Sequence, residues 1–291
     1  MLHESEFYCP DCDNGFDVPM PRSRRNFLQT LSGGAAALLA VSAASSLMAA
    51  EDKGAAAKPS ESMVKELFST FSDAQKKELV YPWDHGGKQP SRLATHNSAP
   101  DGKRLRDHYT KAQQDLIRQT LRSILSSDEA LERVSRNGRW DGSRSFDGCG
   151  SVIFGNPDEG PFSWMFAGHH LTLRCDGNSQ PDAGFGGPMY YGHSANGYAD
   201  ANVYVYQTRQ VHEVFDALNA KQRENAMEDP ARQVDRDRAL KFQDPRPGIA
   251  LSELSADQKE LVQKVMRVLL DPFRKEDADE VMQIVKDNGG M

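Results

Sequence analysis

The sequence has little cysteine, few tryptophans and no excess of positive charge. Four cysteines and three tryptophans occur in 291 residues, and 35 Lys and Arg stand against 42 Asp and Glu, for a net charge of −7. Binding to nucleic acid or to an anionic membrane surface rests on clustered positive charge. We therefore expect no nucleic acid among the partners of this chain.

A long, strongly apolar run is also lacking. Residues 31–50 are rich in Ala, Leu, Ser and Gly, and they follow Arg24-Arg25 in the context Ser-Arg-Arg-Asn-Phe-Leu. This context is typical of a twin-arginine signal, and the glycines and serines make the run too weakly apolar for a transmembrane helix. We predict that residues 1–50 are an N-terminal extension and signal peptide recognised by the twin-arginine export machinery. The remainder is then periplasmic or secreted, with no stable membrane span after signal removal.

The few cysteines limit what they can do. Cys9 and Cys12 form a C-x-x-C pair upstream of the predicted signal. A structural zinc site would require a second such pair, and the sequence has none. Cys149 and Cys175 remain. They could form a disulfide in an oxidising periplasm, or they could be two small buried side chains.

What is present is helical periodicity with a small amount of strand pattern. Residues 51–60 form a polar linker, and residues 61–291 are long enough for one domain with a substantial core. Helices are predicted at residues 110–126, 127–135, 207–227, 256–270 and 276–287, and strands at residues 151–154 and 162–175. We therefore predict an α+β fold, a mostly helical single domain around a small antiparallel β-sheet.

The candidate site lies in and after the second strand pattern. If residues 169–175 continue one strand past Gly168, His169 lies on an apolar face and His170 on a polar face. His193, on the glycine-rich loop of residues 176–202, could approach His170. Two imidazoles with a carboxylate or water suit zinc, copper or iron. We predict a transition-metal site at His170, His193 and, where a bulge at Gly168 turns its ring, His169.

Other interpretations of these residues stay open. The histidine spacing matches no standard ligand motif, so a structurally satisfied histidine pair is the alternative to a metal site. Four acidic residues could supply an acid/base pair, although the sequence does not place them: Asp141, Asp147, Asp158 and Glu159. The glycines of residues 184–187 lack the lysine of a phosphate loop, and Ser194 beside His193 lacks a nucleophile elbow.

The residues around the histidines suggest how a ligand is held. Arg174 is predicted to orient an anionic group of the substrate, with Tyr190 or Tyr191 lining the pocket. A second hypothesis is an aromatic platform for a sugar, in which Trp164 and Tyr198 join these tyrosines. The alternative for Trp164 is the core face of its strand.

Several short segments carry a family resemblance. Residues 154–157 read FGNP, residues 164–171 read WMFAGHHL, and residues 190–194 read YYGHS. With these segments the chain resembles a family of exported bacterial proteins known as domain of unknown function 3500, from about residue 61 to the end. The resemblance implies no established activity. It also implies further aromatic-rich strands with a His-x-His, so we expect this chain to lack the C-terminal strands of the domain.

The leading functional hypothesis is an exported, metal-supported periplasmic enzyme, a hydrolase or an oxidoreductase, with a histidine-centred site. The alternative is a non-catalytic module that binds a glycan or another cell-envelope partner. Metal content and glycan retention distinguish the two hypotheses.

Overall fold

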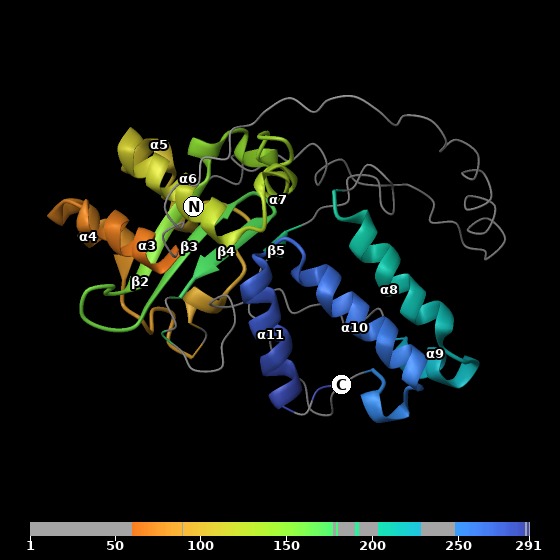
Figure 1. The fold of residues 1–291 in the computed structure, drawn as a ribbon. Coiled ribbons are helices and arrows are strands. Elements are labelled where there is room, and N and C mark those ends of the chain that lie inside the picture. Colours follow the sequence, from red (N-terminus) through yellow and green to blue (C-terminus); the bar gives the residue numbers. More distant parts are fainter. Residues whose placement is uncertain are drawn as a thin grey trace, which may run out of the picture. The chain divides into compact units, whose positions relative to one another are not determined.

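The computed structural model describes residues 60–88, 90–176, 179, 190–191, 203–227, 248–288 and 290 (Figure 1). All of them belong to one compact unit, Ala57–Met291. The first unit, Met1–Ala56, lies outside the described residues, and with it the predicted signal and the C-x-x-C pair. Among the described helices, none combines the length and the apolar character needed to cross a membrane.

A mixed sheet lies at the centre of the described part, with five strands in the order β1-β2-β3-β4-β5. The strands are β1 (Val80–Tyr81), β2 (Gly150–Gly155), β3 (Phe162–Gly168), β4 (Leu171–Cys175) and β5 (Tyr190–Tyr191). Neighbouring strands are antiparallel, except that β1 runs parallel to β2. The α+β class is confirmed. The parallel pair was not predicted, because residues 80–81 follow a helical pattern directly.

The second predicted strand is two strands. Gly168 at the end of β3 pairs with Leu171 at the start of β4, so His169 and His170 form a two-residue hairpin turn. His170 has a φ of 60°, in the left-handed region that allows the chain to reverse here. The prediction that the two imidazoles point to opposite faces of one strand, with a bulge at Gly168, is therefore wrong.

Nine α-helices accompany the sheet in the described part of the chain. They are α3 (Ser60–Ser69), α4 (Asp73–Leu79), α5 (Leu105–His108), α6 (Lys111–Ile124), α7 (Asp128–Val134), α8 (Val205–Ala217), α9 (Ala220–Ala226), α10 (Ala256–Leu270) and α11 (Lys275–Asp287). Side-chain caps at Thr110, Ser127 and Ser255 accept a backbone N–H at the start of α6, α7 and α10. Short 3-10 helices occur at Ser91–Leu93, Pro100–Gly102, Asp141–Ser143, Phe146–Gly148 and Leu251–Glu253.

One face of the sheet packs against α3 and α6. Trp164 and Phe166 of β3 are fully buried and belong to one cluster with Leu67 of α3 and Ile117 of α6. Burying a large apolar side chain of this kind contributes about 1.5–3 kcal/mol. Trp164 is thus a core residue, as one of its two interpretations predicted.

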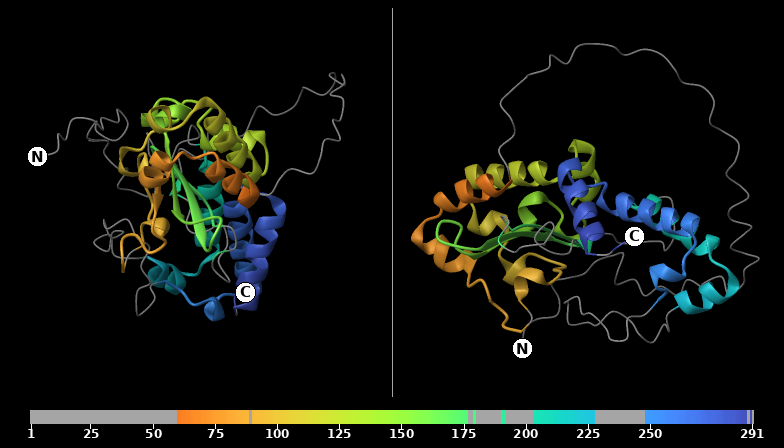
Figure 2. Two further views of the ribbon diagram at one scale, coloured as in Figure 1. Left: turned by 90° about the vertical axis from the view of Figure 1, so that its left-hand side faces the viewer. Right: turned by 60° about the horizontal axis from the view of Figure 1, so that its bottom comes forward.

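The opposite face is covered by the irregular segment of residues 90–104 (Figure 2). Thr172 of β4 donates its hydroxyl proton to the carbonyl of His96 and accepts the N–H of the same residue, at 2.9 and 2.8 Å. Arg174 donates from Nε to the carbonyl of Arg92 at 2.6 Å and from its terminal nitrogen to the carbonyl of Ala94. The polar face predicted for β4 therefore exists, but it is buried.

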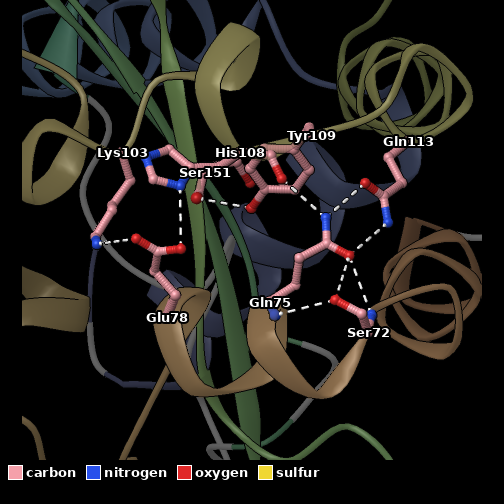
Figure 3. A network of polar contacts seen from close by, with 8 residues as sticks. All are labelled: Ser72, Gln75, Glu78, Lys103, His108, Tyr109, Gln113 and Ser151. Atoms are coloured by element: carbon pink, nitrogen blue, oxygen red, sulfur yellow. Dashed lines mark hydrogen bonds and ion pairs between the residues drawn. The ribbon is translucent and has the colours of Figure 1, made fainter.

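Polar contacts fix the chain before α6 against α4 and the sheet (Figure 3). Glu78 of α4 lies 2.8 Å from Nζ of Lys103 and 3.3 Å from Nδ1 of His108. The hydroxyl of Tyr109 donates to the carbonyl of Ser151 on β2 at 2.8 Å. The segment that covers the second face is thus anchored at its C-terminal end.

The C-terminal helices contact the rest of the described chain around the end of α6 and at α7. α8 packs along α10, and α11 follows α10 (Figures 1 and 2). Leu125, after α6, forms an isolated antiparallel bridge with Phe273, between α10 and α11. The backbone N–H of Ser126 donates to the carbonyl of Pro272 at 2.8 Å.

Candidate metal centre

The β3–β4 turn brings two histidines to one aspartate. Asp141, His169 and His170 each offer one potential ligand atom, and these atoms all lie within 4.8 Å of one another. The two imidazole centroids are 3.7 Å apart. His170 is buried, whereas Asp141 and His169 are half-buried. Two imidazoles and a carboxylate are a ligand set that suits zinc and other first-row transition metals.

Side chains from two distant segments hold the backbone of the turn. The N–H of His169 donates to Oγ of Ser143 at 2.8 Å, and the N–H of His170 donates to Oδ1 of Asn97 at 2.9 Å. A Cβ at Gly168 would lie 2.7 Å from Sγ of Cys149, so a larger residue does not fit before the turn. The turn is therefore fixed by the segment over the second face and by the loop that carries Asp141.

Two positively charged or proton-donating groups hold the carboxylate of Asp141. Nδ1 of His170 lies 3.3 Å from Oδ2, and Nε of Arg136 lies 2.9 Å from Oδ1. Burial alone would raise the pKa of Asp141, but the hydrogen bond from His170 and the charge of Arg136 outweigh it and hold that pKa below its usual value. The carboxylate is therefore ionised at neutral pH, as a metal ligand must be.

The hydrogen bonds also assign different protonation to the two rings. The N–H of Gly142 donates to Nδ1 of His169 at 3.1 Å, so in the neutral ring the proton sits on Nε2. Nδ1 of His170 faces an ionised carboxylate, which only accepts, so this nitrogen carries the proton and the lone pair is on Nε2.

Strained backbone is concentrated around the same residues. In the described part of the chain seven non-glycine residues have positive φ: Asp101, Arg136, Asn137, Trp140, Asp141, Arg144 and His170. Five of these lie in residues 136–144, and another is His170 itself. Such conformations cost about 1–3 kcal/mol each and persist where the surroundings determine them, often at functional sites.

Packing in the hydrophobic core helps to hold this strained loop in place. The buried ring of Trp140 lies 5.5 Å from the ring of Phe146 and 5.7 Å from that of Phe166, between centroids. The residue directly before Asp141 is therefore anchored in the hydrophobic core, and the carboxylate projects from a fixed backbone.

The other predicted site residues have different outcomes. His193 lies outside the described residues. Tyr190 and Tyr191 are described only by their backbone, which pairs with Thr172 and Leu171 next to the turn. Arg174 is 3% exposed, and its described partners are the two main-chain carbonyls, so its role in substrate binding stays a prediction.

Sequence reasoning missed the residues that complete the site. Asp141 was one of four acidic residues whose positions relative to the histidines the sequence did not indicate, and Arg136 was not predicted as a site residue. The turn signals Asn-Gly at residues 137–138 and Asp-Gly at residues 141–142 were the local indications of this loop. Of the alternatives for the cysteines, the structure shows the second: Cys149 and Cys175 are buried, and no disulfide joins them.

Comparison with known proteins adds a family. Neither the curated proteins nor the solved structures contain a match to this chain. A family model described as "Protein of unknown function (DUF3500)" matches residues 53–290. This range includes the β3–β4 turn and the loop of residues 136–144. The chain therefore belongs to the DUF3500 family of proteins of unknown function.

Proposed function

We propose that Asp141, His169 and His170 bind a divalent transition metal, and that the chain is an exported, metal-supported enzyme, either a hydrolase or an oxidoreductase. The observation that carries this proposal is the convergence of three ligand atoms within 4.8 Å of one another. His193, predicted as a further ligand, lies outside the described residues and is not needed for this set.

The ligand set favours a catalytic over a purely structural metal. Structural zinc sites use four protein ligands, whereas catalytic sites keep positions open for water or substrate. Two histidines and one carboxylate leave such positions on zinc or on non-haem iron. A metal there acidifies bound water for hydrolysis or supplies a redox centre. Metal binding at Nδ1 of His169 would take the place of the hydrogen bond from the N–H of Gly142.

The glycan-binding alternative has less support. Its aromatic platform included Trp164, which is fully buried in the core and unable to stack on a ligand. The export part of the proposal rests on Arg24-Arg25 and the apolar stretch that follows. Replacement of both arginines by lysine should leave the protein in the cytoplasm of an expressing bacterium, as cell fractionation would show. Unchanged export of the variant would contradict the proposal that the twin-arginine pathway exports this protein.

The metal is tested on the exported protein by elemental analysis after loading with zinc or ferrous iron. We expect about one equivalent per chain. His170→Asn and Asp141→Asn should lose it, since asparagine keeps a residue type tolerated at these positive φ angles. His212→Asn, at an exposed position of α8, should retain it. Equal metal content in all four proteins, or no metal in any, contradicts the proposal.

A further inference from the structure

We propose that the substrate of this site carries an oxyanion group, a carboxylate or a phosphate, and that Arg139 and Arg144 bind it. The inference rests on the proposed metal function, since it places the anion beside Asp141. It concerns the loop of residues 136–144, which we call the arginine loop.

The charge of the arginine loop is opposite to that of the chain. The chain has a net charge of −7, whereas the loop holds three arginines and one aspartate, a local charge of +2. A bound divalent metal adds to this positive charge. A positive site in a negative molecule attracts anions locally while the rest of the surface repels them. The electrostatics of the site therefore select an anionic ligand.

The three arginines of the loop have different partners. Arg136 is used by Asp141, at 2.9 Å. Arg139 and Arg144 are exposed, and among the described residues neither side chain has an ion pair, a hydrogen bond or an aromatic partner. Other exposed arginines do find carboxylates: Arg122 pairs with Asp128 and Arg267 with Asp279. The two arginines that flank Asp141 at positions −2 and +3 are thus available to a ligand.

The loop presents these side chains from a fixed backbone. The N–H of Arg144 donates to the carbonyl of Asp141 at 2.9 Å, and the N–H of Arg139 donates to the carbonyl of Arg136 at 3.3 Å. Trp140, between them, is buried in the core. A rigid element loses little entropy when it binds a ligand. A guanidinium also matches the geometry of carboxylate and phosphate with two parallel hydrogen bonds.

The test measures binding of inorganic phosphate and of acetate to the exported protein by calorimetry at constant ionic strength, with and without bound zinc. The variants are Arg139→Gln, Arg144→Gln and their combination. The matched controls are Arg122→Gln and Arg267→Gln, which remove exposed arginines elsewhere. Glutamine keeps the polarity and approximate length of these exposed side chains, so the fold is retained. Elemental analysis of each variant reports the metal separately.

We expect the wild-type protein to bind at least one of the two anions. The double variant should bind that anion at least about tenfold more weakly, which is the loss in affinity expected when at least one charge-assisted hydrogen bond is removed. A preference for phosphate or for acetate shows whether the substrate's anionic group is a phosphate or a carboxylate. Both controls should bind as wild type does. Binding should weaken as salt is raised.

Two outcomes overturn the inference. One is equal anion binding by the wild type and the double variant. The other is absence of binding of either anion to zinc-loaded wild type up to about 10 mM, weaker than any useful recognition. Loss of metal in the ligand variants is a separate measurement. If no metal binds but the double variant still loses the anion, the metal proposal fails and the arginine site stands.

Discussion

Arg136 and Asp141 form an ion pair in which Nε lies 2.9 Å from Oδ1, on the side of the carboxylate away from His170. The arginine therefore positions the carboxylate of Asp141, a proposed metal ligand, without occupying the oxygen that faces the imidazole. Groups that orient metal ligands in this way typically change metal affinity about 10- to 100-fold when removed.

Replacing Arg136 should weaken metal binding while leaving the fold intact. We expect Arg136→Ala to raise the dissociation constant for zinc about 10- to 100-fold, measured by competition with a chromogenic chelator. Arg136→Lys should restore part of the affinity, because it returns the charge but not the planar geometry. Arg122→Ala, an exposed arginine paired with Asp128, is the control. Unchanged affinity in Arg136→Ala would show that the ion pair has no positioning role.

Gly142 should tolerate no side chain. A Cβ there would lie 2.9 Å from Cγ and 3.0 Å from Nδ1 of His169. We expect Gly142→Ala to displace the ring, to lower the free energy of unfolding by about 1–3 kcal/mol and to reduce metal affinity. Gly160→Ala is the matched control, since nothing lies within 4 Å of its Cβ position. Denaturant unfolding and chelator competition check both. A Gly142→Ala protein that behaves like the control contradicts the packing described for His169.

The buried thiol of Cys149 should make stability fall at alkaline pH. Burial raises the pKa of this thiol from its ordinary value near 9 to about 12. Between these values the unfolded chain has released the proton and the folded chain keeps it. The unfolded state then binds fewer protons, so the free energy of unfolding decreases with pH, by at most about 1.4 kcal/mol per pH unit for one group.

Cys149→Ala tests this dependence. The variant should show a shallower decline of the unfolding free energy from pH 9 upward than the wild type, measured by urea unfolding. Some decline should remain, because burial also raises the pKa of the Tyr109 hydroxyl. Identical slopes for the two proteins would mean that the thiol ionises as freely in the folded state as in the unfolded state.

Arg174 is expected to act on stability. Burial lowers the pKa of its guanidinium, a cost that the hydrogen bonds to the carbonyls of Arg92 and Ala94 offset. Arg174→Met should lower the free energy of unfolding by about 2–4 kcal/mol, because two buried carbonyls lose their donor. Arg122→Met, at an exposed position, should change it by less than about 0.5 kcal/mol. A stable Arg174→Met protein that no longer binds anions would instead support the substrate-binding role predicted from the sequence.

The helices were predictable because their signals are local. Thr110, Ser127 and Ser255 stand directly before apolar patterns with helical spacing, and each caps the expected helix. The buried face of β3 was likewise readable from Phe162, Trp164 and Phe166. The spacing of apolar residues and the identity of the N-cap residue depend only on residues that are close together in the chain, so both can be recognised in a single sequence.

The turn at His169 and His170 was not predictable in the same way. Apolar and polar residues alternate through it without interruption, and it lacks the Asn-Gly or Asp-Gly pair that marks most two-residue hairpins. His170, at φ 60°, is held by Asn97, 73 positions away, and its neighbour His169 is held by Ser143, 26 positions away. These contacts, like the approach of Asp141 to the two histidines, form only in the tertiary structure, so local sequence patterns do not indicate them.

The polar face of β4 shows the same limit. Alternation assigned Thr172 and Arg174 to one face correctly, but it did not indicate which part of the chain covers that face. Main-chain groups of residues 92–96 satisfy both side chains, and the face is buried. A pattern of residue types gives the face of a strand, and only the packed neighbours decide whether that face meets solvent.

The two-residue length of the β3–β4 turn has a consequence for how the site can change. Since no spare residue separates the paired positions Gly168 and Leu171, the pairing of the two strands alone decides which imidazole meets the carboxylate. A slip of one residue would exchange the two rings or carry both away. Mutations deep inside the sheet can thus disrupt the proposed metal site at the end of β3 and β4, even when Asp141, His169 and His170 are all unchanged.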